Sequence, residues 1–154
     1  MGTNREVLKN AKRIVVKVGT SIITYDTGKV NFSRIDRLAR VLSDVMNQGR
    51  EVVLVTSGAI GVGVGRLKLR EKPKTVREKQ AVAAVGQCEL MHIYSKFFSE
   101  YGYIVGQILL TRDVVDDGHR RQNVINTFET LLEKGIIPIV NENDSVAIDE
   151  IEYG

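Results

Sequence analysis

A chain of 154 residues is long enough to form one domain with a hydrophobic core of its own. It is 43% hydrophobic and 27% charged, and it contains no apolar run near the roughly 20 residues that cross a bilayer, so we expect no membrane partner. The N-terminus is polar and the single cysteine, Cys88, excludes an internal disulfide, which together favour a cytoplasmic protein.

The first third of the chain reads as strand, helix, strand. A β-branched run over residues 13–18 ends at a glycine and predicts a buried strand. After a polar connection over 24–31, a capping-box-like start at Ser33 precedes apolar residues that recur at helical spacing over 35–46. A second strand is expected over 51–56.

The connection from Arg66 to Lys79 carries seven basic residues against two acids, although the formal charge of the whole chain is only +3. Such a run is typical either of a nucleic-acid patch or of a solvated connection between helices. No aromatic residue lies among the basic ones to stack on bases, so we interpret it as a solvated connection and expect no nucleic-acid partner.

The rest of the chain repeats the alternation of helix and strand. Helices are expected over 75–101 and 120–134, and strands over 103–110 and 136–140. This order predicts an α/β fold for a single domain over 1–154, with a mostly parallel sheet and helices on both faces in three layers. Because ligands of such sheets bind beyond the carboxyl ends of the strands, a site is expected in the loops that follow them.

The first strand ends in Lys17-Val18-Gly19-Thr20-Ser21. A glycine turn lets the backbone approach an anion, and the lysine and two hydroxyls can bind phosphate oxygens. The segment is not a Walker A loop, because the G-x-x-x-x-G-K-[ST] pattern is absent. Taken alone, it fits an exposed lysine beside an ordinary turn equally well.

The second strand runs into Ser57-Gly58 and a glycine-rich stretch. The spacing of these glycines differs from the dinucleotide fingerprint, and no G-x-S-x-G elbow makes Ser57 an acyl-transfer nucleophile. We predict a helix N-terminus that faces an anion, with Ser57 at its cap. Packing of the helix against the sheet accounts for Gly61, Gly63 and Gly65.

The fourth strand is followed by Asn141-Glu142-Asn143-Asp144. Two amides and two acids can recognise an ammonium and carbonyl groups, or hold a metal through water, and polar loops also cap and turn. Three such strand ends at one edge of the sheet indicate a zwitterionic substrate beside a phosphate. Phosphoryl transfer requires mainly alignment and neutralisation of charge, which these residue types can supply.

Five blocks of sequence stand in one order: Lys17–Ser21, Val55–Ile60, Ala83–Gln87, Gly106–Thr111 and Asn141–Asp144. As a set they closely resemble the glutamate-phosphorylating branch of the amino acid kinase family, from about Arg13 to the end of the chain. The resemblance implies a transferase that uses ATP and Mg²⁺ to phosphorylate the γ-carboxylate of L-glutamate, the first step of proline biosynthesis. It also implies inhibition by proline, a glutamyl phosphate reductase as pathway partner, and a homo-oligomer.

The same resemblance implies roles for individual residues. It makes Lys17 the catalytic residue, places the ATP phosphates at Lys17, Gly19, Thr20 and Ser21, and places the substrate at Ser57, Gly58, Asn141 and Asp144. No residue of the chain is assigned to a metal. Members of the family continue beyond Gly154 into a nucleotide-binding half, so we expect this chain to be the N-terminal, substrate-binding portion. The alternatives are a member of the family that acts on another small carboxylate, and a non-catalytic regulatory or oligomerisation module.

Overall fold

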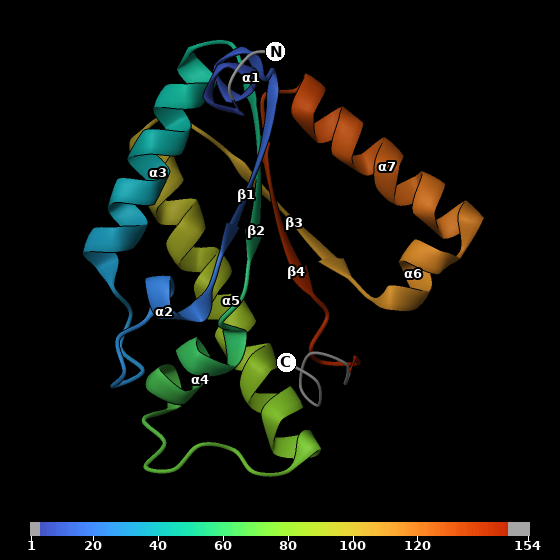
Figure 1. Ribbon diagram of the computed structural model, residues 1–154. Coiled ribbons are helices and arrows are strands. Elements are labelled where there is room, and N and C mark those ends of the chain that lie inside the picture. The colour runs from blue at the N-terminus through green and yellow to red at the C-terminus, as the bar shows by residue number, and fades with distance from the viewer. Residues whose placement is uncertain (1–3, 148–154) are drawn as a thin grey trace.

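A computed structural model describes residues 4–147 and contains a four-stranded sheet (Figure 1). The strands are parallel and pair in the order β1-β2-β4-β3. Their bounds are Arg13–Val18 for β1, Glu51–Thr56 for β2, Val105–Leu110 for β3 and Ile137–Glu142 for β4. All four carboxyl ends therefore meet at one edge of the sheet.

Helices lie on both faces of this sheet, α3 and α5 on one and α7 on the other (Figure 1). We refer to these as the α5 face and the α7 face. The helices are α1 Asn4–Asn10, α2 Thr20–Ile23, α3 Phe32–Asn47, α4 Ala59–Leu67, α5 Val76–Glu100, α6 Arg112–Asp116 and α7 Gly118–Glu133. The prediction of a three-layer α/β fold with a parallel sheet is confirmed.

The alternation of side chains along the strands divides the core into two parts. Val52 and Leu54 of β2 point to the α5 face, where they join a large buried cluster that includes Tyr94 and Phe98 of α5. Val53 points to the α7 face and joins a smaller cluster. Both faces of β2 are thus covered, which explains why its sequence is almost continuously apolar.

Several element boundaries differ from the sequence predictions. Helix α3 begins at Phe32, because the Asn31 side chain accepts the amide of Arg34 at 3.1 Å and caps the helix in place of Ser33. Strand β4 continues through Glu142, two residues beyond the predicted end. The short helices α1, α2 and α6 were not predicted, because four to seven residues are too few to show a helical period.

The expectation that the glycines of α4 pack this helix against the sheet is wrong. Gly63 faces α5, while Gly61 faces Thr20 and Gly65 faces Gly28. A Cβ on Gly63 would lie 2.2 Å from the carbonyl oxygen of Val82, and one on Gly86 of α5 would lie 1.6 Å from that of Ala59. The two helix backbones are therefore in direct contact. This contact fixes the N-terminus of α4 at the edge of the sheet where the strands end.

None of the helices within residues 4–147 combines the length and the apolar composition that a membrane span requires.

Candidate functional site

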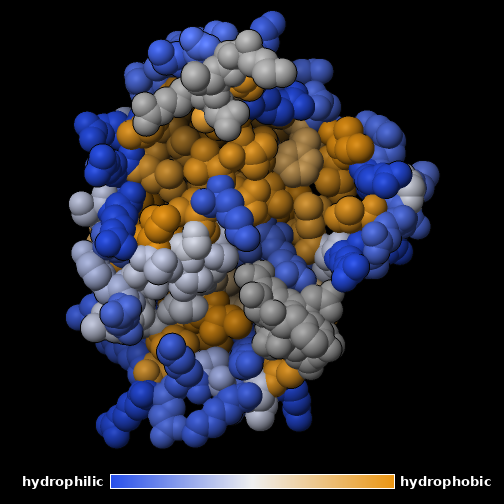
Figure 2. All heavy atoms as spheres, in the orientation of Figure 1, coloured by the Kyte–Doolittle hydropathy of each residue, from blue (hydrophilic) through white to orange (hydrophobic). Residues whose placement is uncertain are grey.

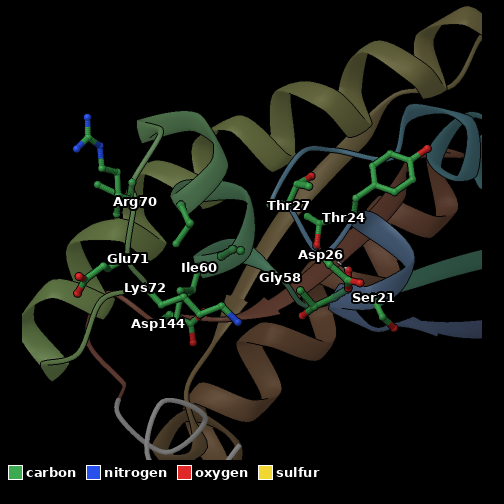
Figure 3. A pocket seen from close by; sticks show the side chains of 17 residues that line it. Ser21, Thr24, Asp26, Thr27, Gly58, Ile60, Arg70, Glu71, Lys72 and Asp144 are labelled. Carbon is green, nitrogen blue, oxygen red and sulfur yellow. Dashed lines mark hydrogen bonds between the residues drawn. The ribbon is translucent and has the colours of Figure 1, made fainter.

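A cavity of about 710 Å³ opens at the carboxyl ends of the strands (Figure 3). Its size is within the usual range for small-molecule sites. Four segments form its walls: the start of α2, a hairpin around residues 25–28, the first turns of α4, and a loop over residues 69–72. Asp144, just after β4, completes the lining.

The predicted phosphate loop lies at one side of this cavity. Gly19 has an extended backbone and precedes α2, and a Cβ built on it would meet no atom within 4 Å, so an anion can approach its backbone. Thr20 and Ser21 follow in α2 and line the cavity. The loop is thus open at its glycine, and two hydroxyl-bearing residues contribute to the cavity wall.

Lys17 lies next to this loop but does not line the cavity. It is exposed on β1, and strand alternation places it on the α7 face together with Arg13 and Val15. Its ammonium group is therefore available outside the cavity, near the point where β1 ends.

Ser57 connects the end of β2 to the end of the edge strand β1. Its hydroxyl donates to the carbonyl of Val18 at 3.3 Å and lies 3.4 Å from the hydroxyl of Thr20. The prediction that Ser57 caps α4 is wrong, since Gly58 occupies the cap position with φ at 95° and makes no side-chain hydrogen bond there. Glycine adopts this left-handed conformation without strain, which allows the sharp turn from β2 into α4.

The N-terminus of α4 points its free amides at the cavity. The first intrahelical bond runs from the amide of Val62 to the carbonyl of Gly58, so the preceding amides have no partner within the helix. The residues that carry them are Ala59, Ile60 and Gly61, and all three line the cavity. Together with the helix dipole, these amides favour a negatively charged ligand group.

A buried hydrogen bond stabilises the turn from β2 into α4. The Thr56 hydroxyl, at the end of β2, lies 2.8 Å from the hydroxyl of Tyr94 on α5. Burial raises the pKa of Tyr94 to about 12, although its hydrogen bond with Thr56 lowers the pKa in part. Tyr94 therefore stays neutral at physiological pH, and its position holds the end of β2 against α5.

The two predicted substrate residues after β4 lie in different surroundings. Asp144 lines the main cavity and also a second one of about 420 Å³ between α5 and the ends of β3 and β4. Asn141 is only 4% exposed, and its side chain donates to Gln87 at 2.8 Å and accepts from the amide of Glu142 at 2.9 Å. Gln87 in turn donates to Gln107 at 3.2 Å, so Asn141 belongs to a chain of amides that ties β4 to α5 and β3.

The structure thus brings Thr20, Ser21, Gly58 and Asp144 together around the cavity. Lys17, Gly19, Ser57 and Asn141 do not line it. The sequence does not predict two of the lining segments. These are the hairpin with Asp26, which is expected as a polar connection, and the loop with Lys72, which is expected as a solvated connection. The run of basic residues at 66–79 was the available signal for the second segment, but its sequence does not reveal which lysine turns inward.

Within residues 4–147, no group of three or more His, Cys, Asp or Glu side chains is arranged to hold a metal ion.

A parallel sheet with a cavity at its carboxyl edge is typical of α/β proteins that bind a ligand beyond the ends of their strands. The model of the amino acid kinase family matches residues 12–153, and the chain belongs to this family.

Among its relatives, a glutamate 5-kinase of Clostridium perfringens is 68% identical over 148 residues, which are 96% of this chain and 55% of the relative. One of Listeria innocua is 62% identical over 149 residues, 97% of the chain and 54% of the relative. One of Clostridium acetobutylicum is 54% identical over all 154 residues and 58% of the relative. The chain spans about half the length of the curated relatives it matches, and the resemblance seen in the sequence is confirmed.

Proposed function

We propose that this chain provides the amino-acid-binding part of a kinase that phosphorylates the γ-carboxylate of L-glutamate, yielding glutamyl 5-phosphate for proline biosynthesis. The observation that carries the proposal is the cavity, because it presents anion donors on one wall and the carboxylate of Asp144 on another. A zwitterionic dicarboxylate needs both kinds of partner. The identity of 68% to a relative named glutamate 5-kinase supports glutamate as that dicarboxylate.

In this proposal, Asp144 pairs with the ammonium group of the substrate. The free amides of α4 and the backbone at Gly58 bind a carboxylate, and Ser57 holds the turn that positions them. An oxygen of the γ-carboxylate attacks the terminal phosphorus of ATP, the bond from that phosphorus to the bridging oxygen breaks, and ADP leaves. The nucleophile is already ionised at neutral pH, so no general base is needed.

We propose further that the loop at Gly19–Ser21 and the ammonium of Lys17 bind the transferring phosphoryl group. The residues fit a phosphate, since Gly19 leaves open space and Thr20 and Ser21 present hydroxyls. ATP would supply the phosphoryl group, and Mg²⁺ would offset charge on the phosphates. Lys17 would stabilise negative charge that develops on the same oxygens.

The test measures acyl phosphate formation by the protein produced from its complete gene. Hydroxylamine traps glutamyl phosphate as a hydroxamate, and we expect product with L-glutamate and ATP. A clear preference for aspartate, acetylglutamate or another carboxylate would assign the chain to a different kinase of the family. Absence of phosphorylation by folded protein with every substrate would leave a non-catalytic module and overturn the proposal.

A matched pair of variants tests the assignment of Asp144. Asp144→Asn removes the charge that pairs with the ammonium, and we expect the KM for glutamate to rise about tenfold or more. Asp116→Asn removes the same charge from exposed helix α6, away from the cavity, and serves as the control. Equal KM values for the two variants would remove Asp144 from the proposed substrate site.

A further inference from the structure

Lys72 lies in a loop that the sequence presents as solvated, yet it forms part of the cavity wall. In Figure 3 its side chain reaches into the cavity, whereas the side chains of Arg70 and Glu71 turn outward. Ser21 and Asp26 lie on the other side of the same space. The loop therefore directs one of its many charges at whatever the cavity binds.

Two of the basic residues around Lys72 form ion pairs. Arg66 lies 3.5 Å from Glu89 of α5, and Lys74 lies 2.7 Å from Glu71. No ion pair or hydrogen bond joins the Lys72 side chain to another residue in the described part of the chain. Its ammonium is thus free to pair with a ligand, while its neighbour Glu71 is already engaged.

The loop that carries Lys72 is fixed at both of its ends. At the first end, Lys68 adopts φ of 54° and the amide of Leu69 donates to the carbonyl of Val64 at 3.1 Å, which turns the chain back over α4. At the second end, the Glu78 carboxylate accepts the amides of Lys74 and Thr75, each at 3.0 Å. A short segment held in this way limits the positions that the Lys72 side chain can reach.

The position of Lys72 relative to the phosphate loop indicates which ligand group it meets. If glutamate is the substrate, as proposed above, its γ-carboxylate must face Gly19–Ser21, where phosphate is expected. Its α-carboxylate then points away from that loop and into the cavity. Lys72 is a cation of the cavity wall, while Lys17 lies outside the cavity.

We propose that Lys72 binds the α-carboxylate of the amino acid substrate and is a specificity-determining residue of this site. An ammonium that pairs with a carboxylate inside a cavity contributes to binding in the ground state and in the transition state alike. Its loss therefore raises KM and leaves kcat nearly unchanged. The proposal rests on the proposed function, and it assigns a role that glutamate turnover by itself would not reveal.

The experiment compares Lys72→Met with Lys68→Met in steady-state kinetics of the protein from its complete gene. Both variants lose one positive charge from the same loop, but Lys68 does not line the cavity. We expect Lys72→Met to raise the KM for L-glutamate by roughly 10- to 100-fold with the KM for ATP unchanged, and Lys68→Met to resemble the wild type. Lys72→Arg, which keeps the charge, should recover most of the lost affinity.

Three results decide the matter. Equal KM values for glutamate in Lys72→Met and Lys68→Met would overturn the proposal, provided that both variants unfold at the wild-type urea concentration. A rise confined to the KM for ATP would also overturn it, because Lys72 would then contact phosphate. A wild-type protein that phosphorylates no glutamate refutes the proposed function instead, and this is seen before any variant is made.

Discussion

The two faces of the sheet differ in how much packed structure they carry. On the α5 face, the strands meet α3, α4 and α5 in one cluster that contains the largest fully buried side chains, Tyr94 and Phe98 among them. On the α7 face, the buried cluster consists of Val53, Ile108, Leu132 and Val140. Most of the hydrophobic stabilisation therefore comes from the α5 face.

The α7 face is also the more open of the two. Val15 of β1 is 62% exposed although its neighbours in the strand, Ile14 and Val16, are partly buried on the α5 face. Figure 2 shows apolar atoms gathered at the surface between α3 and α7, over the strands. The well-packed α5 face therefore positions the cavity, while the more open α7 face carries Lys17.

The largest expected change in stability comes from replacing one phenylalanine on each face of the sheet and comparing the two losses. Phe98→Ala empties a fully buried site on the α5 face, and we expect it to lower the free energy of unfolding by about 3 to 5 kcal/mol. Phe128→Ala on the α7 face removes a ring that is only partly buried and should cost clearly less. Urea denaturation followed by circular dichroism measures both, and equal losses would show that the faces contribute alike.

The next effect concerns the contact between α4 and α5. Gly86→Ala places a methyl group 1.6 Å from the Ala59 carbonyl oxygen, so the helices must separate, at a cost of about 2 to 3 kcal/mol. Gly118→Ala at the start of α7 meets no atom within 4 Å and is the control, expected to be neutral or slightly stabilising.

Gly86→Ala also links stability to the site. Because Ala59 opens α4, separation of the helices moves the amides that face the cavity, and glutamate binding measured by calorimetry should weaken as well. A variant that keeps wild-type stability and binding would show that the close contact does not position the site.

The sequence predicts the packed face better than it predicts the site. The strands β1 and β2 were placed within their observed bounds, because β-branched runs that end at glycine or serine have few other interpretations. The sequence predicts only part of the cavity lining, because the lining depends on which loop residues turn toward the cavity. Asp26 is brought to the cavity by a hairpin packed on α4, where a Cβ on Gly65 would lie 2.1 Å from the Gly28 carbonyl oxygen. No period or motif in the sequence reports such a contact.

The sequence likewise gives the type of each candidate site residue but not the direction in which its side chain points. Lys17 is predicted to bind phosphate. Strand alternation places it on the α7 face, but which face of β1 is covered by which helix is known only from the folded sheet. Asn141 is predicted to meet the substrate, and in the structure its side chain donates a hydrogen bond to Gln87. Amide side chains suit both roles, so residue type alone could not distinguish them.

A smaller effect is expected from Tyr94, and it depends on pH. Tyr94→Phe removes one hydrogen bond to Thr56 and should cost about 1 kcal/mol at pH 7. The pKa of Tyr94 is raised to about 12 in the folded protein, above the value of about 10 for an unfolded chain. The wild type should therefore keep its full stability below pH 10 and lose roughly 2 to 3 kcal/mol as the pH rises from 10 to 12.

Tyr94→Phe lacks this titration, so its stability should change less over the same range. The difference between the two proteins isolates Tyr94 from lysines and other tyrosines that titrate nearby in pH. Urea midpoints at several pH values between 9 and 12 measure it. Parallel curves for the two proteins would mean that the Tyr94 hydroxyl is accessible to water, and that the α5 face is less tightly packed than the buried cluster indicates.

The smallest effect tests the open face directly. Arg13 of β1 lies 2.7 Å from Glu51 and 2.8 Å from Glu129 of α7, and these hydrogen bonds raise the pKa of its guanidinium. Its side chain is nevertheless 42% exposed, and ion pairs at that exposure contribute little because water and salt screen them. Arg13→Met should therefore cost less than Tyr94→Phe, and the difference from the wild type should vanish near 1 M NaCl, where the screening length is about 3 Å.

Arg37→Met, on the exposed side of α3, controls for the loss of a positive charge. The prediction is contradicted if Arg13→Met lowers the free energy of unfolding as much as Phe98→Ala does, and if the loss persists at high salt. That result would mean that Arg13, and not the small cluster beneath α7, holds this helix onto the sheet.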